Sequence, residues 1–162
     1  MIDLNSRRRI GTTQCMVGPL GLGTAPLGNL YESVSDTTAE ATLTAAERCG
    51  ITWFDAAPLY GSGLAEIRLG RHLRHSAGSP PVISTKVGRI LKPIPHSEAH
   101  PHFIAPLPFR AVFDYSRDGI ERSYQDSLRG LGVERVALLV LHDVYRLSHP
   151  SGHRALVTLL FG

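Results

Sequence analysis

Four side chains could together move a proton to or from a carbonyl oxygen: those of Asp55, Tyr60, Lys86 and His142. A tyrosine hydroxyl has an ordinary pKa of about 10, which is too high for efficient acid–base catalysis near neutral pH. A nearby lysine ammonium favours the phenolate and lowers that pKa, and a carboxylate keeps the lysine oriented and charged. A histidine can hydrogen-bond the substrate oxygen. This set of residues predicts chemistry in which a proton and a hydride pass between a carbonyl and an alcohol.

The four residues stand where a parallel sheet would bring them together. Asp55, Lys86 and His142 each follow directly after a short apolar segment, and Tyr60 lies in the loop after the first of them. The carboxyl ends of parallel strands open on one face, which holds the active site in both barrels and open sheets. One polar residue at a strand end is as well explained by a structural role. Four residues of fitting type at successive positions favour a catalytic site.

The intervening sequence alternates between predicted strands and helices. Strands are expected at residues 19–24, 51–54, 81–85 and 136–141, and helices from Thr37 to Gly50, from Gly63 to Arg74, and from Ser116 to Gly132. This alternation indicates right-handed βαβ units and a parallel sheet. Composition does not decide between an open sheet and a barrel. The last strand is continuously apolar, which predicts burial on both faces.

Local patterns refine these elements. Thr37 and Glu40 have the spacing of a capping box. Residues 8–18 predict a short hairpin, and residues 87–115 predict a long loop, because they are rich in proline and histidine. The third helix carries an apolar stripe, expected to face the core, of Ile120, Tyr124, Leu128 and Leu131.

Composition narrows the class of protein. The chain has 162 residues, 43% of them apolar and 19% charged, as in a globular domain. A net charge of +3 is too small to indicate nucleic-acid binding. No secretory signal and no apolar stretch of membrane-spanning length is seen, so a cytoplasmic protein without a membrane partner is expected. No metal site is expected either, because the loop histidines His96, His100 and His102 lack further ligands.

Around the four residues, the sequence resembles the aldo-keto reductase family. The similarity spans about residues 8–145 and is closest to the bacterial sugar and pyridoxal dehydrogenase branch. It is carried by Gly21-Leu22-Gly23-Thr24, by residues 54–61 (Phe-Asp-Ala-Ala-Pro-Leu-Tyr-Gly), by Glu66, Leu69 and Gly70, by Ser84-Thr85-Lys86-Val87-Gly88 and by Leu141-His142-Asp143.

The resemblance implies a (β/α)₈ barrel that uses NAD or NADP to oxidise or reduce a sugar-like or other small carbonyl or alcohol substrate. It assigns Tyr60 as the general acid and base, with Lys86 and Asp55 tuning its pKa. His142 would orient the substrate carbonyl. Gly23 and Thr24, together with Asp55, would lie near the nicotinamide as cofactor-binding residues.

A complete barrel of this kind needs about 250 residues. We therefore expect a partial barrel of about four parallel strands in residues 1–146, preceded by the short hairpin, and a divergent tail in residues 147–162. We interpret the chain as truncated and catalytically impaired, able to self-associate through open sheet edges. The alternative is a catalytically silent fragment or interaction module. The apolar run 155–161 is either a short helix that covers a sheet edge or non-native sequence.

Overall fold

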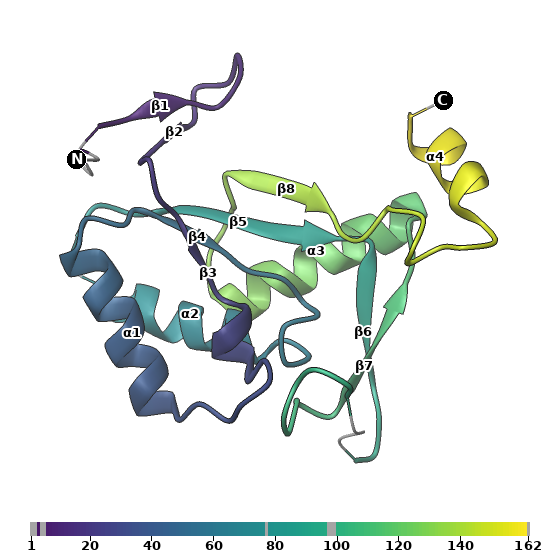
Figure 1. Ribbon diagram of the computed structural model, residues 1–162, viewed down its shortest axis with the longest axis horizontal. Helices are drawn as coiled ribbons and strands as arrows, with labels where there is room; N and C mark the ends of the chain where they lie inside the picture. Colours follow the sequence, from purple (N-terminus) through teal and green to yellow (C-terminus); the bar gives the residue numbers. More distant parts are fainter. Residues whose placement is uncertain (1–2, 4–5, 77, 97–99, 162) are drawn as a thin grey trace.

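A computed structural model describes residue 3 and residues 6–76, 78–96 and 100–161 (Figure 1). The strands are β1 (Arg8–Arg9), β2 (Met16–Val17), β3 (Leu22–Gly23), β4 (Trp53–Asp55), β5 (Val82–Val87), β6 (Arg89–Pro93), β7 (Phe109–Phe113) and β8 (Leu138–Leu141). The helices are η1 (Ala25–Gly28, a 3₁₀ helix), α1 (Asp36–Arg48), α2 (Leu64–His75), α3 (Arg117–Leu131) and α4 (His153–Phe161). Within this part of the chain, no helix is both long enough and apolar enough to span a membrane.

The central feature is a four-stranded parallel sheet in the order β3-β4-β5-β8. Its register sets Gly23 opposite Asp55, Asp55 opposite Ser84, and Lys86 opposite Val140. The antiparallel pair of β1 and β2 precedes it. The predicted fold class, a partial (β/α) barrel with about four parallel strands after a short hairpin, is confirmed.

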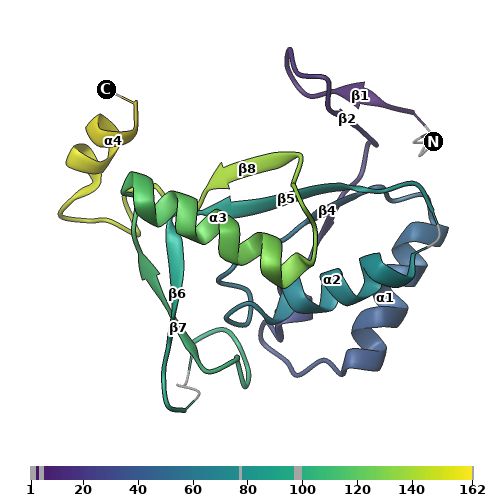
Figure 2. The same cartoon turned by 180° about the vertical axis from the view of Figure 1, so that it is seen from behind.

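Helices α1, α2 and α3 all lie on the same side of this sheet, as Figures 1 and 2 show. The core fills the space between them, because strand side chains alternate between faces and only one face meets the helices. Its fully buried side chains include Leu43, Phe54, Leu69 and Leu131. Each such side chain contributes roughly 1.5–3 kcal/mol through burial. The opposite face of β4 and β5 is left to carry polar residues.

The predicted capping box of α1 is wrong. The N-cap is Ser35, whose hydroxyl accepts a hydrogen bond from the Thr38 amide at 3.0 Å. Glu40 does not reach back to the start of the helix, because its carboxylate pairs with Nδ1 of His72 on α2 at 2.7 Å. A tertiary contact thus overrides the local pattern.

The predicted apolar stripe of α3 is right only in part, because Leu131 is fully buried but Ile120, Tyr124 and Leu128 are half-buried. The residues of this helix that become buried are Gly119, Ser123, Ser127 and Leu131. Small residues bring α3 close to α2, where a Cβ added to Gly70 would lie 2.5 Å from the Leu131 carbonyl oxygen. Close helix packing therefore determines this face more than hydrophobicity does.

The predicted loop 87–115 contains the antiparallel hairpin of β6 and β7. Proline content suggested a loop, yet Pro93 ends β6, a position that a strand tolerates. The hairpin projects beyond the sheet (Figure 1). It brings residues 100–108 back toward the end of β4, since the Leu107 amide donates to the Gly61 carbonyl at 3.1 Å.

Strand β8 is not buried on both faces, contrary to the sequence prediction. Leu139 and Val140 are 48% and 46% exposed. Within the described part of the chain β8 pairs with β5 alone and lies at the edge of the sheet, which leaves these two side chains partly open to solvent. The tail forms α4, but both views place this helix away from the four-stranded sheet (Figures 1 and 2). It therefore does not cover the sheet edge, and the domain boundary at residue 146 stays a prediction.

Two glycines bring the backbone of η1 against the turn that carries Tyr60. A Cβ on Gly28 would lie 2.5 Å from the Tyr60 carbonyl carbon, and a Cβ on Gly61 would lie 2.5 Å from the Gly28 oxygen. Gly61 also has a φ of +63°, which favours glycine. The position of Tyr60 depends on this contact between two backbones.

We predict that Gly28→Ala lowers the free energy of unfolding by about 2–4 kcal/mol, because neither backbone can retreat from the added methyl group. Urea denaturation followed by circular dichroism measures this change. Gly152→Ala is the matched control, since no atom lies within 4 Å of its added Cβ. Equal stability of the two variants would contradict the prediction.

Candidate active site

Strand alternation brings Asp55 and Lys86 to the same face of the sheet. On β4, Phe54 is buried in the core, so the neighbouring Asp55 faces the other way. On β5, Thr85 points toward α2, where it contacts Glu66, and Lys86 points to the side of Asp55. This face, opposite the helices, is where the predicted site forms.

Lys86 and Asp55 form a direct ion pair. Lys86 Nζ lies 2.5 Å from Asp55 Oδ2 and donates a second hydrogen bond to the Ala56 carbonyl at 2.9 Å. The side chain of Lys86 is 14% exposed. A charge so largely removed from water needs such partners, and they fix the position of its ammonium group.

Two residues that the sequence prediction missed support this pair. Ser84 donates to Asp55 Oδ1 at 2.7 Å, and Trp53 Nε1 donates to the Ser84 hydroxyl at 3.0 Å. Both carboxylate oxygens of Asp55 are thereby occupied, one by Ser84 and one by Lys86. Their spacing in the sequence could have identified them. Trp53 lies two residues before Asp55, and Ser84 lies two residues before Lys86, so each shares a face of its strand with a predicted site residue.

Tyr60 lies between Lys86 and His142. The Lys86 ammonium is 4.8 Å from the centroid of the Tyr60 ring. The rings of Tyr60 and His142 meet edge to face, with centroids 6.0 Å apart, and Phe103 packs on Tyr60 at 6.2 Å. The structure thus brings all four predicted catalytic residues together, from the ends of β4, β5 and β8.

His142 is buried, and this burial lowers its pKa from 6.5 to about 4. The nearby carboxylate of Asp143 opposes that shift, but Asp143 is paired with Arg89 at 2.5 Å. The backbone of His142 is held by the Tyr115 hydroxyl, which donates to the His142 carbonyl. His142 is therefore a neutral imidazole near pH 7, with one donor and one acceptor nitrogen. Its Nδ1 is buried without a partner among the described residues.

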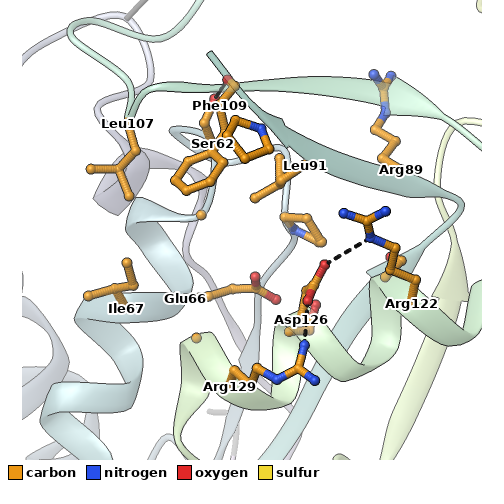
Figure 3. A pocket seen from close by; sticks show the side chains of 16 residues that line it. Ser62, Glu66, Ile67, Arg89, Leu91, Leu107, Phe109, Arg122, Asp126 and Arg129 are labelled. Carbon is orange, nitrogen blue, oxygen red and sulfur yellow. Dashed lines mark hydrogen bonds and ion pairs between the residues drawn. The ribbon is translucent and has the colours of Figure 1, made fainter. Parts of the chain in front are cut away.

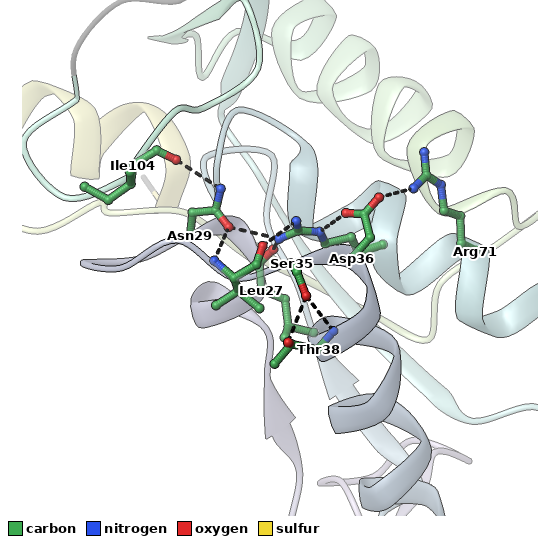
Figure 4. Close-up of polar contacts among 9 residues, drawn as sticks. Leu27, Asn29, Ser35, Asp36, Thr38, Arg71 and Ile104 are labelled. Carbon is green, nitrogen blue, oxygen red and sulfur yellow. Dashed lines mark hydrogen bonds and ion pairs between the residues drawn. The ribbon is translucent and has the colours of Figure 1, made fainter.

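A buried arginine anchors the loops beside the site. Arg68 on α2 is 8% exposed, and it holds four acceptors at 2.7–3.0 Å: Asp36 Oδ1, Asn29 Oδ1 and the carbonyls of Leu27 and Val34. Asn29 in turn donates its amide to the Ile104 carbonyl at 3.0 Å (Figure 4). This contact holds the segment that packs Phe103 against Tyr60. The side wall of the site thus depends on Arg68.

Of the three residues assigned to the cofactor, Asp55 belongs to the ion pair described above, and Gly23 and Thr24 differ in their surroundings. Gly23 is exposed in register with Asp55, and a Cβ added there would meet no atom within 4 Å. Open space of this kind fits a flat ring close to the backbone. Thr24 is fully buried, and its hydroxyl donates to the Asp55 carbonyl at 2.9 Å. Its observed contact joins β3 to β4, and its cofactor role stays a prediction.

No cluster of metal-ligating side chains is found in the described part of the chain. His100 and His102 lie with ring centroids 5.9 Å apart, and neither belongs to a group of three ligands. The side chains that meet at the site are a tyrosine, a lysine–aspartate pair and a neutral histidine. Such a set can exchange a proton with a substrate oxygen.

Comparison with known proteins agrees with this geometry. Residues 19–157 match the model of the Aldo/keto reductase family. The chain belongs to this family. Among curated relatives, pyridoxal 4-dehydrogenase of Microbacterium luteolum is 42% identical over 94% of the chain and 47% of its own length. D-threo-aldose 1-dehydrogenase of a Pseudomonas species is 41% identical over 78% of the chain and 40% of its own length.

A solved aldo-keto reductase from Pseudomonas aeruginosa has the same fold, with a TM-score of 0.66 and 29% identity. The match covers 97% of this chain and 56% of that structure. The aldo-keto reductase chain described here therefore spans about half the length of the relatives it matches. Its four parallel strands correspond to part of the barrel of such proteins.

We predict that the ring of His142 stays neutral from pH 7 down to about pH 5, because burial disfavours the imidazolium. NMR titration of the ring nitrogens measures this, with His142→Gln identifying the signals. The pKa of His142 is near 4 in the folded state, below the ordinary value of 6.5 that applies to the unfolded chain. Between pH 6.5 and pH 4 the unfolded chain therefore binds more protons at His142 than the folded chain does. The contribution of His142 to stability should therefore fall as pH falls from about 6.5 to about 4. A midpoint near 6.5 would contradict the prediction.

Proposed function

We propose that this aldo-keto reductase is an NAD(P)-dependent oxidoreductase of a small, sugar-like or other aldehyde or alcohol, with Asp55, Tyr60, Lys86 and His142 as its catalytic residues. One observation carries most weight. The ammonium group of Lys86 contacts Asp55 at 2.5 Å and lies 4.8 Å from the Tyr60 ring. A cation held in that place can stabilise the negative charge that develops on the tyrosine when its hydroxyl gives up a proton.

In the direction of reduction, the Tyr60 hydroxyl donates its proton to the substrate carbonyl oxygen. The Lys86 ammonium stabilises the phenolate that remains, and Asp55 keeps the ammonium in place. His142, being neutral, hydrogen-bonds the same substrate oxygen and orients the carbonyl. Oxidation of an alcohol reverses each of these steps.

The nicotinamide cofactor would supply or accept the hydride. Gly23 is the residue best suited to lie beside the ring, since it offers open space level with Asp55. The family uses NAD or NADP, and binding by this chain is part of the proposal. So is the substrate class, which is supported by the relatives that are named as dehydrogenases of pyridoxal and of D-threo-aldoses. A cytoplasmic location stays a prediction.

The first test is titration of the chain with NADH and with NADPH, followed by nicotinamide fluorescence on a sample shown to be folded by circular dichroism. Weak but saturable binding is expected of a chain interpreted as catalytically impaired, and turnover is then assayed with pyridoxal and with aldoses. A folded chain that binds neither nucleotide would contradict the proposal that this chain holds the cofactor.

We predict that Tyr60→Phe lowers turnover by at least about 100-fold, the contribution expected of a general acid–base group. Nucleotide affinity should change little, because the aromatic ring remains. Tyr145→Phe is the matched control, since Tyr145 is half-exposed in the segment after β8 and lies outside the site. Equal turnover by the two variants would remove Tyr60 from its assigned role.

We also propose that the chain self-associates through β8. This edge strand exposes Leu139 on one face and Val140 on the other, and no second strand pairs with it among the described residues, so its outer backbone groups favour strand addition. Hydrophobic side chains on both faces of an edge strand are typical of a surface that meets a partner.

We predict that Leu139→Lys weakens self-association at least about tenfold, because the new charge would be buried in the contact. Sedimentation velocity over a range of concentrations measures the change. Leu147→Lys introduces the same charge at a side chain that is 88% exposed in the tail and should have little effect. A chain that stays monomeric at all concentrations would contradict this proposal.

A further inference from the structure

A cavity of about 320 Å³ lies between α2, α3 and the hairpin of β6 and β7. Its size is at the lower end of ligand pockets, which begin at about 300 Å³. Figure 3 shows the side chains that line it, converging from all three elements. Its apolar wall includes Ile67, Leu91, Leu107 and Phe109.

This cavity is separate from the candidate active site. Thr85 and Lys86 are adjacent on β5 and point to opposite faces of the sheet. Lys86 faces the site, and Thr85 faces the helices, where its hydroxyl donates to Oε1 of Glu66 at 2.7 Å. Glu66 lines the cavity. The cavity and the proposed oxidoreductase site therefore lie on opposite faces of β5.

Glu66 is a buried carboxylate with no cation in contact with it among the described residues. It is 3% exposed, and burial raises its pKa from 4.5 to about 6. The Lys86 ammonium acts on it only from the far side of β5 and is already paired with Asp55. Glu66 is thus ionised near neutral pH without a direct counter-charge, which is unfavourable in a buried position.

A second buried polar group lines the same cavity. The Ser123 hydroxyl is buried, lines the cavity, and has no hydrogen-bond partner among the described residues. Such a hydroxyl can accept a hydrogen bond from a ligand. The hydroxyl can donate or accept, so the carboxylate decides which ligand fits. An ionised carboxylate only accepts hydrogen bonds, and a protonated amine only donates them.

The arginines around the cavity do not make it an anion site. Arg122 and Arg129 are 57% and 73% exposed, and both pair with Asp126 (Figure 3). Arg89 directs its guanidinium away from the cavity and pairs with Asp143. The cationic groups are thus at the rim or turned away, and the buried acceptors are inside.

We propose that this cavity binds a small molecule with an apolar body and a protonated amine, with the Glu66 carboxylate as its counter-ion and the Ser123 hydroxyl as a second acceptor. The apolar wall would contact the body of the ligand. Its volume limits that body to roughly one ring or a short aliphatic chain.

Benzylamine is a suitable probe, because it has one ring and an ammonium group at neutral pH. Its binding to the full chain is measured at pH 8 by isothermal titration calorimetry, and the site is located by NMR chemical-shift changes. We expect weak, saturable binding, with shifts at Glu66, Ser123 and Leu91. Benzyl alcohol and benzoate, which have the same ring but no positive charge, should each bind at least about tenfold more weakly.

Two variants test the assigned residues. Glu66→Gln keeps an acceptor for Thr85 and removes the charge, and it should weaken benzylamine binding at least about tenfold. Glu121→Gln, at an exposed position on α3 outside the cavity, is the matched control. Leu107→Trp fills the cavity from the hairpin side without altering its polar floor, and it should also abolish binding. It keeps the test decisive if Glu66→Gln fails to fold.

The proposal is overturned by any of three results. One is the absence of benzylamine binding up to about 50 mM. Another is equal affinity for benzoate or benzyl alcohol, which would indicate a merely apolar pocket. The third is unchanged affinity in folded Leu107→Trp, which would place the bound amine elsewhere. Nucleotide binding plays no part in these measurements, so failure of the oxidoreductase proposal would leave their outcome unaffected.

Discussion

The alternation of side chains along β5 is the constraint on which the rest of the structure depends. Its residues 84–86 are nearly covered on both faces, yet each carries a polar side chain that must find a partner. Thr85 finds Glu66 among the helices, while Ser84 and Lys86 share Asp55 on the other face. A shift of register by one residue would reverse both faces, leaving the ammonium against Glu66 and the core. The polar partners therefore fix the register as firmly as the apolar core does.

Much of the fold could be predicted from the sequence, because its main signals are periodic or local. The alternation of apolar segments with helical stretches correctly indicated the parallel sheet. The positions of the four site residues near strand ends correctly predicted that they lie close together. The polar groups at the carboxyl ends of β4, β5 and β8 were informative, because the carboxyl ends of parallel strands open on one face.

The failures concern features that depend on contacts between distant segments. Glu40 could not be expected to leave its own helix, because its partner His72 is 32 residues away. The buried face of α3 depends on how closely α2 approaches it. The small side chains of Ser123 and Ser127 permit a close approach, but their presence in the sequence does not predict one. The exposure of β8 depends on whether another element packs beside it. Its apolar composition does not show whether it lies at the edge or in the middle of the sheet. Trp53 and Ser84 were missed although strand periodicity would have found them.

The order of the strands in the sheet is the same as their order along the chain. Each strand pairs with the one before it, and none has to enter between two strands that are already joined. During synthesis from the N-terminus, β4 can pair with β3 as soon as it emerges, and β5 and β8 can follow in turn, each adding to the free edge. Loop closure then joins strands that are neighbours in the sheet, and its entropic cost grows slowly with the length of the connecting segment. The arrangement that leaves β8 exposed is thus also one that lets the sheet grow one strand at a time.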